Sequence, residues 1–304
     1  MKKKKILIVG GTGFIGYHLS KFCLKKKWSV TSFSKNPPKK IRKISSVKYI
    51  RGDLCKLKDV KKIKINFNYV VNLGGYVDHS KKKKTYQSHY LGCKNLCDYF
   101  IDKNIDSFVQ MGSGGEYGKI KSPHLENSKC NPKSTYAKAK LLSTKYLLEM
   151  YKKKKFPCTV LRLYQSYGER QDENRLIPIV ITSCLEKKKF PCSEGKQFRD
   201  FIHINDVVQA IIKAIEKNKA KGQIFNLGSG ELINIKNLIK NIKNIVGSGE
   251  PDFGKVKLRS EENLKHYPSI KKIKKFLNWN PKINFNNGLY RTIKYYKKTN
   301  LQIN

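Results

Sequence analysis

A tyrosine and a lysine four residues apart form the pair in this sequence that is best suited to proton transfer. Tyr136 and Lys140 lie in a segment with a helical pattern, where this spacing places two side chains on one face. A nearby ammonium stabilises tyrosinate and lowers the pKa of a tyrosine from about 10. Tyr136 would then exchange a proton with an alcohol or sugar oxygen near neutral pH. Because lysine is abundant here, the spacing also arises by chance, and its meaning depends on neighbouring motifs.

A glycine-rich turn near the start of the chain indicates a dinucleotide site. Gly10, Gly13 and Gly16 follow an apolar stretch typical of a strand and precede a helical pattern. Glycines allow the backbone to approach a pyrophosphate, and a helix N-terminus offers free amides and a partial positive charge. The turn therefore predicts bound NAD or NADP. The expected contacts are Gly10, Thr12, Gly13, Phe14, Ile15 and Gly16, with Leu73 and Gly74 after a later strand.

The end of the second predicted strand bears on the choice between the two dinucleotides. An acidic residue about 20 residues after the turn would hold the ribose 2′-hydroxyl of NAD. The chain has Ser34 at that position, followed by Lys35. A hydroxyl and a cation suit a 2′-phosphate, so NADP is favoured over NAD, although Lys35 also fits a plain surface role. Asp53 and Leu54, after the third predicted strand, are expected beside the adenine.

Strand and helix patterns alternate along the first half of the chain. Apolar stretches predict strands over residues 3–10, 29–33, 47–50, 69–73, 107–111 and 159–163. Helical spacing predicts helices over residues 14–26, 58–63, 91–101 and 135–151. Apolar strands that alternate with helices are typical of a parallel sheet covered on both faces. We therefore expect an α/β fold with a doubly wound Rossmann sheet.

The second half of the chain is less regular and predicts a smaller α/β domain. Helices are expected over residues 175–185, 205–216 and 235–245, with a short strand over 223–227. We expect residues 1–165 to form an NAD(P)-binding Rossmann domain, to which 197–227 return. Residues 166–304 would mainly bind the substrate.

Charge and composition limit the class of protein. The chain has 304 residues and a net charge of +43, from 65 Lys or Arg against 22 Asp or Glu. Only eight of the basic residues are Arg, whereas nucleic-acid binding usually favours Arg for its paired hydrogen bonds. We therefore interpret most of the surplus as solvated lysine and expect no nucleic-acid partner. Apolar residues make up 39%, which is enough for a real core.

Membrane, signal and disulfide patterns are not apparent in the sequence. No apolar run approaches the roughly 18 residues of a membrane helix. The first apolar stretch ends at Gly10 and is too short for a signal peptide. Eight Cys without a Cys-x-x-Cys pair indicate reduced, mostly buried thiols, and with them a cytoplasmic protein. We expect no membrane partner and no metal site.

Further motifs follow the glycine turn and the Tyr136–Lys140 pair in order along the chain. They are Gly112–Gly118, Arg162–Gly168, Gln197–Phe201, Asn226–Gly230 and Leu277–Pro281. Together they resemble the extended short-chain dehydrogenase/reductase family of nucleotide-sugar epimerases, dehydratases and ketoreductases. The resemblance covers nearly the whole chain.

The resemblance implies roles for the residues at matching positions. Ser113 would hydrogen-bond the reacting oxygen of a sugar, and Tyr136 would donate or accept its proton. Lys140 would tune Tyr136 and hold the nicotinamide ribose. The presence of all three residues disfavours a non-catalytic relative that only binds NAD(P) or RNA.

The resemblance also implies a site for a nucleoside diphosphate sugar. Arg199 and Arg259 would bind the diphosphate, and Gln165 stands where many members have Asn among the nucleotide contacts. For Arg199 the alternative is a salt bridge with Asp200 or Asp206. Four of the eight arginines are expected near this diphosphate, namely Arg162, Arg170, Arg175 and Arg199.

Two positions depart from the family pattern. His89 replaces an Asn that many members carry before Gly92, and we expect for it a surface or packing role. Dehydratases carry two acids two and three residues before the Tyr-Gly pair, where this chain has Gly115 and Gly114. Glu116 is displaced by one position and is expected to point elsewhere. Elimination of water is therefore disfavoured.

Two reactions at C4 of the sugar remain open. Ser34, Lys35 and the segment Gly112–Gly118 favour an NADPH-dependent reductase of a nucleotide-linked 4-keto-6-deoxyhexose, with Tyr136 as proton donor. An NAD-dependent 4-epimerase of a nucleotide sugar is the alternative. The resemblance also implies a homodimer through the helices over 91–101 and 135–151.

Overall fold

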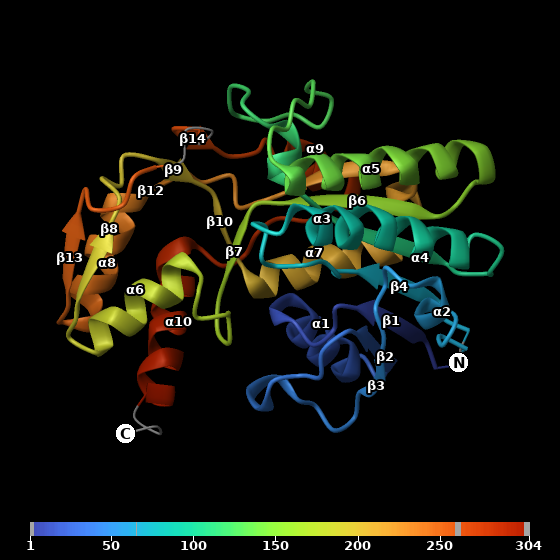
Figure 1. Cartoon of the computed structure of the whole chain (residues 1–304), viewed down its shortest axis with the longest axis horizontal. Helices are drawn as coiled ribbons and strands as arrows, with labels where there is room; N and C mark the ends of the chain where they lie inside the picture. Colours follow the sequence, from blue (N-terminus) through green and yellow to red (C-terminus); the bar gives the residue numbers. More distant parts are fainter. Residues whose placement is uncertain (1–2, 65, 259–262, 301–304) are drawn as a thin grey trace.

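A seven-stranded parallel sheet forms the centre of the molecule in the computed structural model, which describes residues 3–64, 66–258 and 263–300 (Figure 1). Its order is β11-β6-β5-β4-β1-β2-β3. The strands are β1 (Lys5–Val9), β2 (Ser29–Ser34), β3 (Lys48–Arg51), β4 (Tyr69–Asn72), β5 (Ser107–Ser113), β6 (Cys158–Leu163) and β11 (Gln223–Leu227). Each predicted strand is confirmed to within two residues, and all neighbours pair in parallel.

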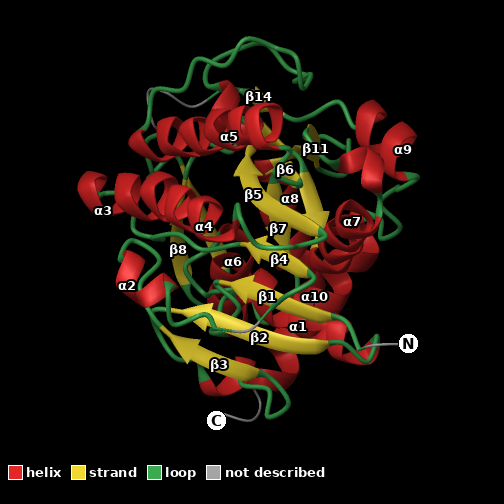
Figure 2. Ribbon diagram, turned by 90° about the vertical axis from the view of Figure 1, so that its right-hand side faces the viewer, coloured by secondary structure: helices red, strands yellow, loops and turns green. Residues whose placement is uncertain are grey.

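Helices cover both faces of this sheet, as Figure 2 shows. On β1, Ile6 and Ile8 face one way and Leu7 and Val9 the other, because successive strand residues alternate between faces. The first pair packs with α1 (Phe14–Lys25), α7 (Ile204–Glu216) and α9 (Lys271–Leu277). The second pair packs with α2 (Leu57–Val60), α4 (Gly92–Phe100) and α5 (Thr135–Lys154). The doubly wound Rossmann fold is confirmed.

The segment before α4 differs from the sequence-based expectation. A short helix, α3 (Lys82–Tyr86), leads into one π-helical turn (Gln87–Leu91), and α4 begins only at Gly92. The run of lysines at the start of α3 carries no apolar periodicity, so the pattern gave no sign of a helix there.

A smaller α/β part lies at one end of the sheet, on the left in Figure 1. Its own apolar cluster joins α6 (Leu176–Leu185), α8 (Ile235–Val246) and α10 (Phe285–Asn300). Short strands pair as β7 (Gln165–Tyr167) with β10 (Phe201–His203), β8 (Lys189–Cys192) with β13 (Glu250–Phe253), and β9 (Phe198–Arg199) with β12 (Ile233–Asn234) and β14 (Lys265–His266). The division into residues 1–165 and 166–304, with 197–227 returning, stays a prediction.

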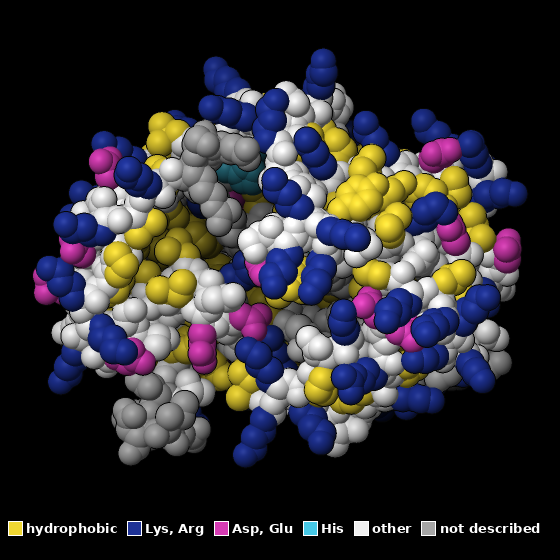
Figure 3. All heavy atoms as spheres, in the orientation of Figure 1, with side chains coloured by type: hydrophobic (Ala, Val, Ile, Leu, Met, Phe, Trp, Pro, Cys, Tyr) yellow, Lys and Arg dark blue, Asp and Glu magenta, His cyan; other side chains and the backbone are white. Residues whose placement is uncertain are grey.

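The surface and the thiols follow the composition. Lys and Arg side chains spread over the whole face seen in Figure 3 rather than along one stripe. All eight cysteines are free thiols, and six of them are buried. No helix in the described part of the chain is long and apolar enough to cross a membrane.

His18 on α1 allows a test of the packing between the two parts of the molecule. Its Nε2 lies 2.9 Å from the Glu169 carbonyl, and burial lowers the pKa of His18 to about 4. An unfolded histidine titrates near 6.5. The unfolded state therefore binds the proton more tightly, and stability present above pH 6.5 is lost as the pH falls towards 4.

We expect His18→Gln to reduce this acid sensitivity. Between pH 7 and pH 5 the variant should lose about 1–2 kcal/mol less of its free energy of unfolding than the wild type. Urea unfolding at the two pH values measures the difference. An equal loss in both proteins would contradict the buried, neutral state of His18.

Candidate active site

A cleft of about 1170 Å³ opens where the carboxyl ends of the central strands meet the smaller part. Pockets for one drug-sized ligand measure roughly 300–1,000 Å³, so this cleft has room for two ligands side by side. Its position is the one where open α/β sheets bind ligands, beside the reversal of strand order at β1 and β4. The predicted dinucleotide contacts that line it are Gly10, Thr12, Gly13, Phe14, Ile15, Gly16, Ser34, Lys35, Leu54, Leu73 and Gly74.

The turn between β1 and α1 has the shape that a pyrophosphate requires. Gly10 has a φ of +76°, and a Cβ there would lie 2.9 Å from the Leu73 carbonyl carbon. A Cβ on Gly16 would lie 2.5 Å from Gly11 Cα, so only glycine lets α1 pack against the turn. The helix begins at Phe14 without an acidic residue in its first turn. Its amides and positive dipole end therefore suit a dinucleotide phosphate.

Lys35 forms an ion pair that was not expected from the sequence. Its Nζ lies 2.8 Å from Asp53 Oδ2. This hydrogen bond raises the pKa of Lys35. Burial opposes ionisation of Asp53, but the bonds from Lys35 and the Cys55 amide lower its pKa overall. Leu54 lines the cleft as expected, whereas Asp53 is directed to Lys35.

Ser113, Tyr136 and Lys140 line the same cleft. The N-cap of α5 is Ser134, whose Oγ accepts a hydrogen bond from the Ala137 amide at 3.2 Å and so places Tyr136 in the first turn. Lys140, one turn later, is only 5% exposed. Its Nζ donates to the Met111 carbonyl at 2.6 Å and lies 5.9 Å from the centre of the Tyr136 ring. The ammonium thus ties α5 to β5, which ends at Ser113.

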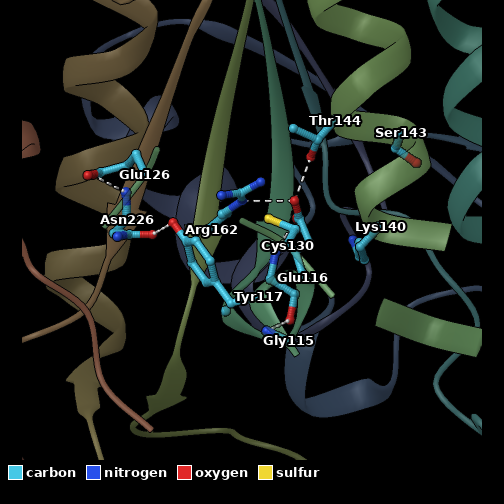
Figure 4. Close-up of polar contacts among 12 residues, drawn as sticks. Gly115, Glu116, Tyr117, Glu126, Cys130, Lys140, Ser143, Thr144, Arg162 and Asn226 are labelled. Atoms are coloured by element: carbon cyan, nitrogen blue, oxygen red, sulfur yellow. Dashed lines mark hydrogen bonds and ion pairs between the residues drawn. The ribbon is translucent and has the colours of Figure 1, made fainter. Parts of the chain in front are cut away.

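Glu116 lies behind this group in a fully buried ion pair, shown in Figure 4. Its Oε1 accepts from the Ser113 amide at 2.9 Å. Its Oε2 accepts from Thr144 Oγ1 and from Arg162 Nε, each at 2.9 Å. Glu116 therefore points away from the cleft, as expected, and connects β5, α5 and β6.

The arginines only partly follow the sequence-based expectation. Arg175 and Arg199 line the cleft. Arg162 instead pairs with Glu116 beneath it, and Arg170 donates to the Ile41 carbonyl and lies over aromatic rings of α1 and α10. The expectation that all four lie near a diphosphate is therefore wrong for Arg162 and Arg170. Position along the chain does not set the direction of a strand side chain.

Arg199 reaches the cleft from β9. Its Nη1 donates to the carbonyls of Phe198 at 2.7 Å and Asn263 at 2.9 Å. The carboxylate of Asp200 accepts from the amides of residues 229 and 230, and that of Asp206 from the amides of residues 282 and 283. The two acids weighed as partners of Arg199 thus each bind backbone amides.

Gln165 lines the cleft, and its contact with a nucleotide stays a prediction. Arg259 lies outside the described residues. Two further side chains in the cleft were missed as site residues, and both contact Tyr136. His89 is 6% exposed and lies edge-on to the phenol ring at 4.8 Å between centroids. His79 stacks on the same ring at 4.1 Å. We expected a surface or packing role for His89. Its place where many family members carry Asn was the sequence feature that could have indicated a residue of the site.

Comparisons with known proteins agree with this fold and site. Residues 6–228 match the NAD dependent epimerase/dehydratase family. A putative UDP-glucose 4-epimerase from Methanocaldococcus jannaschii is 29% identical over 97% of this chain and 99% of its own. A dTDP-D-glucose 4,6-dehydratase from Mus musculus is 26% identical over 97% of this chain and 89% of its own.

Among solved structures, a UDP-glucose 4-epimerase from Thermotoga maritima, determined with UDP-glucose, is similar with a TM-score of 0.92. It is 25% identical and covers 97% of this chain and 99% of its own. The fold and the cleft define a dinucleotide-dependent enzyme of the extended short-chain dehydrogenase/reductase type. The chain belongs to the NAD dependent epimerase/dehydratase family.

Breaking the ion pair beneath the site should destabilise the protein. We expect Glu116→Gln to lower the free energy of unfolding by about 3–5 kcal/mol, because Arg162 then remains buried without a counter-charge. Urea unfolding at pH 7 measures the loss. Glu186→Gln is the matched control, since it breaks an exposed pair with Lys188 and should cost less than about 1 kcal/mol. Equal losses in the two variants would contradict this account.

Proposed function

We propose that the protein is an NAD(P)-dependent oxidoreductase acting at C4 of a nucleotide-linked hexose, and that 4-epimerisation with NAD is its reaction. The observation that carries this proposal is the meeting of Ser113, Tyr136 and Lys140 in one cleft. The dinucleotide turn lies at one end of that cleft, and Arg175 and Arg199 contribute to its lining. Guanidinium groups bind diphosphates through charge-assisted hydrogen bonds.

The residues of the cleft would transfer the proton, and the bound dinucleotide would supply the hydride chemistry. When bound, the nicotinamide would take up a hydride from the sugar and return it. Tyr136 would accept the proton of the sugar hydroxyl and later give it back. Ser113 would hydrogen-bond the same oxygen. Lys140, held by the Met111 carbonyl, would supply positive charge beside the phenol.

Elimination of water is not supported by the carboxylates around the cleft. Glu116 is committed to Arg162, Thr144 and the Ser113 amide. Asp172 is the only carboxylate among the described residues that line the cleft, and it pairs with Arg42 at 3.0 Å. A dehydratase would need an acid free to act beside the tyrosine.

The choice between epimerase and reductase depends on the dinucleotide. A 2′-phosphate beside Lys35 would also approach the Asp53 carboxylate 2.8 Å from its Nζ, and this repulsion weakens the case for NADP. The UDP-glucose 4-epimerases among the similar proteins add support for a UDP-hexose. The NAD dependent family to which the chain belongs adds support for NAD. Reduction of a 4-keto-6-deoxyhexose with NADPH is the second candidate, favoured by the Ser34 hydroxyl in the cleft and the segment Gly112–Gly118.

A homodimer through α4 and α5 also stays a proposal. An apolar patch covers the region of these helices in Figure 3. Leu142 on α5 leaves 37% of its surface exposed. We expect Leu142→Asp to shift the protein from dimer to monomer in gel filtration with light scattering, because the carboxylate would lose its hydration at the interface. A wild type that is already monomeric, or a variant that stays dimeric, would contradict this interface.

The reaction can be tested on the purified protein. With NAD it should interconvert UDP-hexoses that differ at C4 without added NADPH. Tyr136→Phe should lower kcat by about 10²–10⁴-fold, the usual contribution of a general acid–base group. It should keep the rise in melting temperature that NAD causes. Turnover only of a 4-keto sugar, and only with NADPH, would favour the reductase instead.

A further inference from the structure

The loop between β4 and α3, residues 75–80, is held against the cleft by side chains of the π-helical turn. Ser88 Oγ accepts a hydrogen bond from the Tyr76 amide at 2.9 Å. His89 Nε2 lies 3.2 Å from the Tyr76 carbonyl. Both main-chain polar groups of Tyr76 are therefore bound by the turn, and the loop cannot move without breaking these two bonds.

The same turn is fixed to α5, the helix that carries Tyr136. Ser143 Oγ donates to the His89 carbonyl at 2.6 Å. The His89 ring lies edge-on to the phenol at 4.8 Å, and from the loop the His79 ring stacks on it at 4.1 Å, with the planes 17° apart. Tyr136 thus lies between two imidazoles, one from the turn and one from the loop that the turn holds.

The contact with the loop explains why this buried ring is an imidazole. A carbonyl only accepts, so His89 Nε2 carries the proton and Nδ1 is left as an acceptor. Burial, together with the charge of Lys140, lowers the pKa of His89 to about 2, so the ring is neutral. Within the described residues Nδ1 is buried without a hydrogen-bond partner. An apolar ring would avoid this cost, but it could not bind the Tyr76 carbonyl.

Gly75 provides the space for this arrangement. A Cβ at Gly75 would overlap His89 at Cε1 and Nδ1. The backbone at Gly75 does not adopt the left-handed conformation, so glycine is required there for space rather than for its φ.

We propose that His89 is a positioning residue which, with Ser88, holds loop 75–80 closed so that His79 and His89 fix the Tyr136 ring for reaction. This inference rests on the proposed function, because it takes Tyr136 as the proton-transfer group. A reacting group that is already held in its reactive orientation loses less conformational entropy on reaching the transition state, and this lowers the activation barrier.

Limited trypsin digestion measures the loop without any need for turnover. The run Lys81–Lys84 directly follows the loop and offers cleavage sites that mass spectrometry can identify. We expect trypsin to cut Ser88→Ala and His89→Phe there about tenfold faster than the wild type. Loss of one neutral hydrogen bond would raise the equilibrium population of the open loop by about this factor. Gln87→Ala, which leaves both anchors in place, is the matched control and should be cut at the wild-type rate. Cleavage of His89→Phe at the wild-type rate overturns the proposal.

Kinetics separate positioning from binding. In Ser88→Ala and His89→Phe, kcat for a UDP-hexose should fall about tenfold with the NAD-induced melting shift unchanged. His79→Ala keeps the anchors, so it should lower kcat without faster digestion; a wild-type kcat there overturns the role of His79. If the wild type converts no nucleotide hexose, the proposed function fails, while the digestion still decides whether His89 holds the loop.

Discussion

The candidate site depends on one buried carboxylate. Glu116 receives hydrogen bonds from the Ser113 amide, the Thr144 hydroxyl and the Arg162 guanidinium. These donors belong to the end of β5, to α5 and to β6. The one carboxylate therefore fixes the position of Ser113 relative to α5, the helix that carries Tyr136. Burying two charges costs several kcal/mol, and only a fully bonded carboxylate offsets that cost. Glu116 lies one position after the places of the dehydratase acids, and its carboxylate holds the site together.

Space constrains the cleft as strongly as charge does. A Cβ on Gly10 would collide with the backbone after β4, and a Cβ on Gly16 would collide with the glycine turn. The end of the cleft that is expected to bind the dinucleotide therefore requires glycine at both positions. Gly75 also leaves no room for a Cβ, because the imidazole of His89 fills the volume that this atom would take. Close packing of this kind means that a small change at either end alters the shape of the whole cleft.

The large positive charge of the chain says little about the site. Lysines are spread over the visible surface, while three of the cations that line the cleft bind particular acceptors. Lys35 binds Asp53, Lys140 binds the Met111 carbonyl, and Arg199 binds the Asn263 carbonyl. What matters for an anionic ligand is therefore the local arrangement of a few cations, because exposed charges are screened over about 10 Å in salt.

By itself the sequence determined the sheet strands to within two residues, the glycine turn and the Tyr136–Lys140 pair, because each depends on spacing within one segment. Only the tertiary structure decided that Arg162 turns to Glu116, that Lys35 meets Asp53 and that His89 lies against Tyr136. These contacts join residues that are 18 to 47 positions apart in the chain. Their formation depends on which face of a strand or helix packs against which neighbour, and local periodicity does not contain that information.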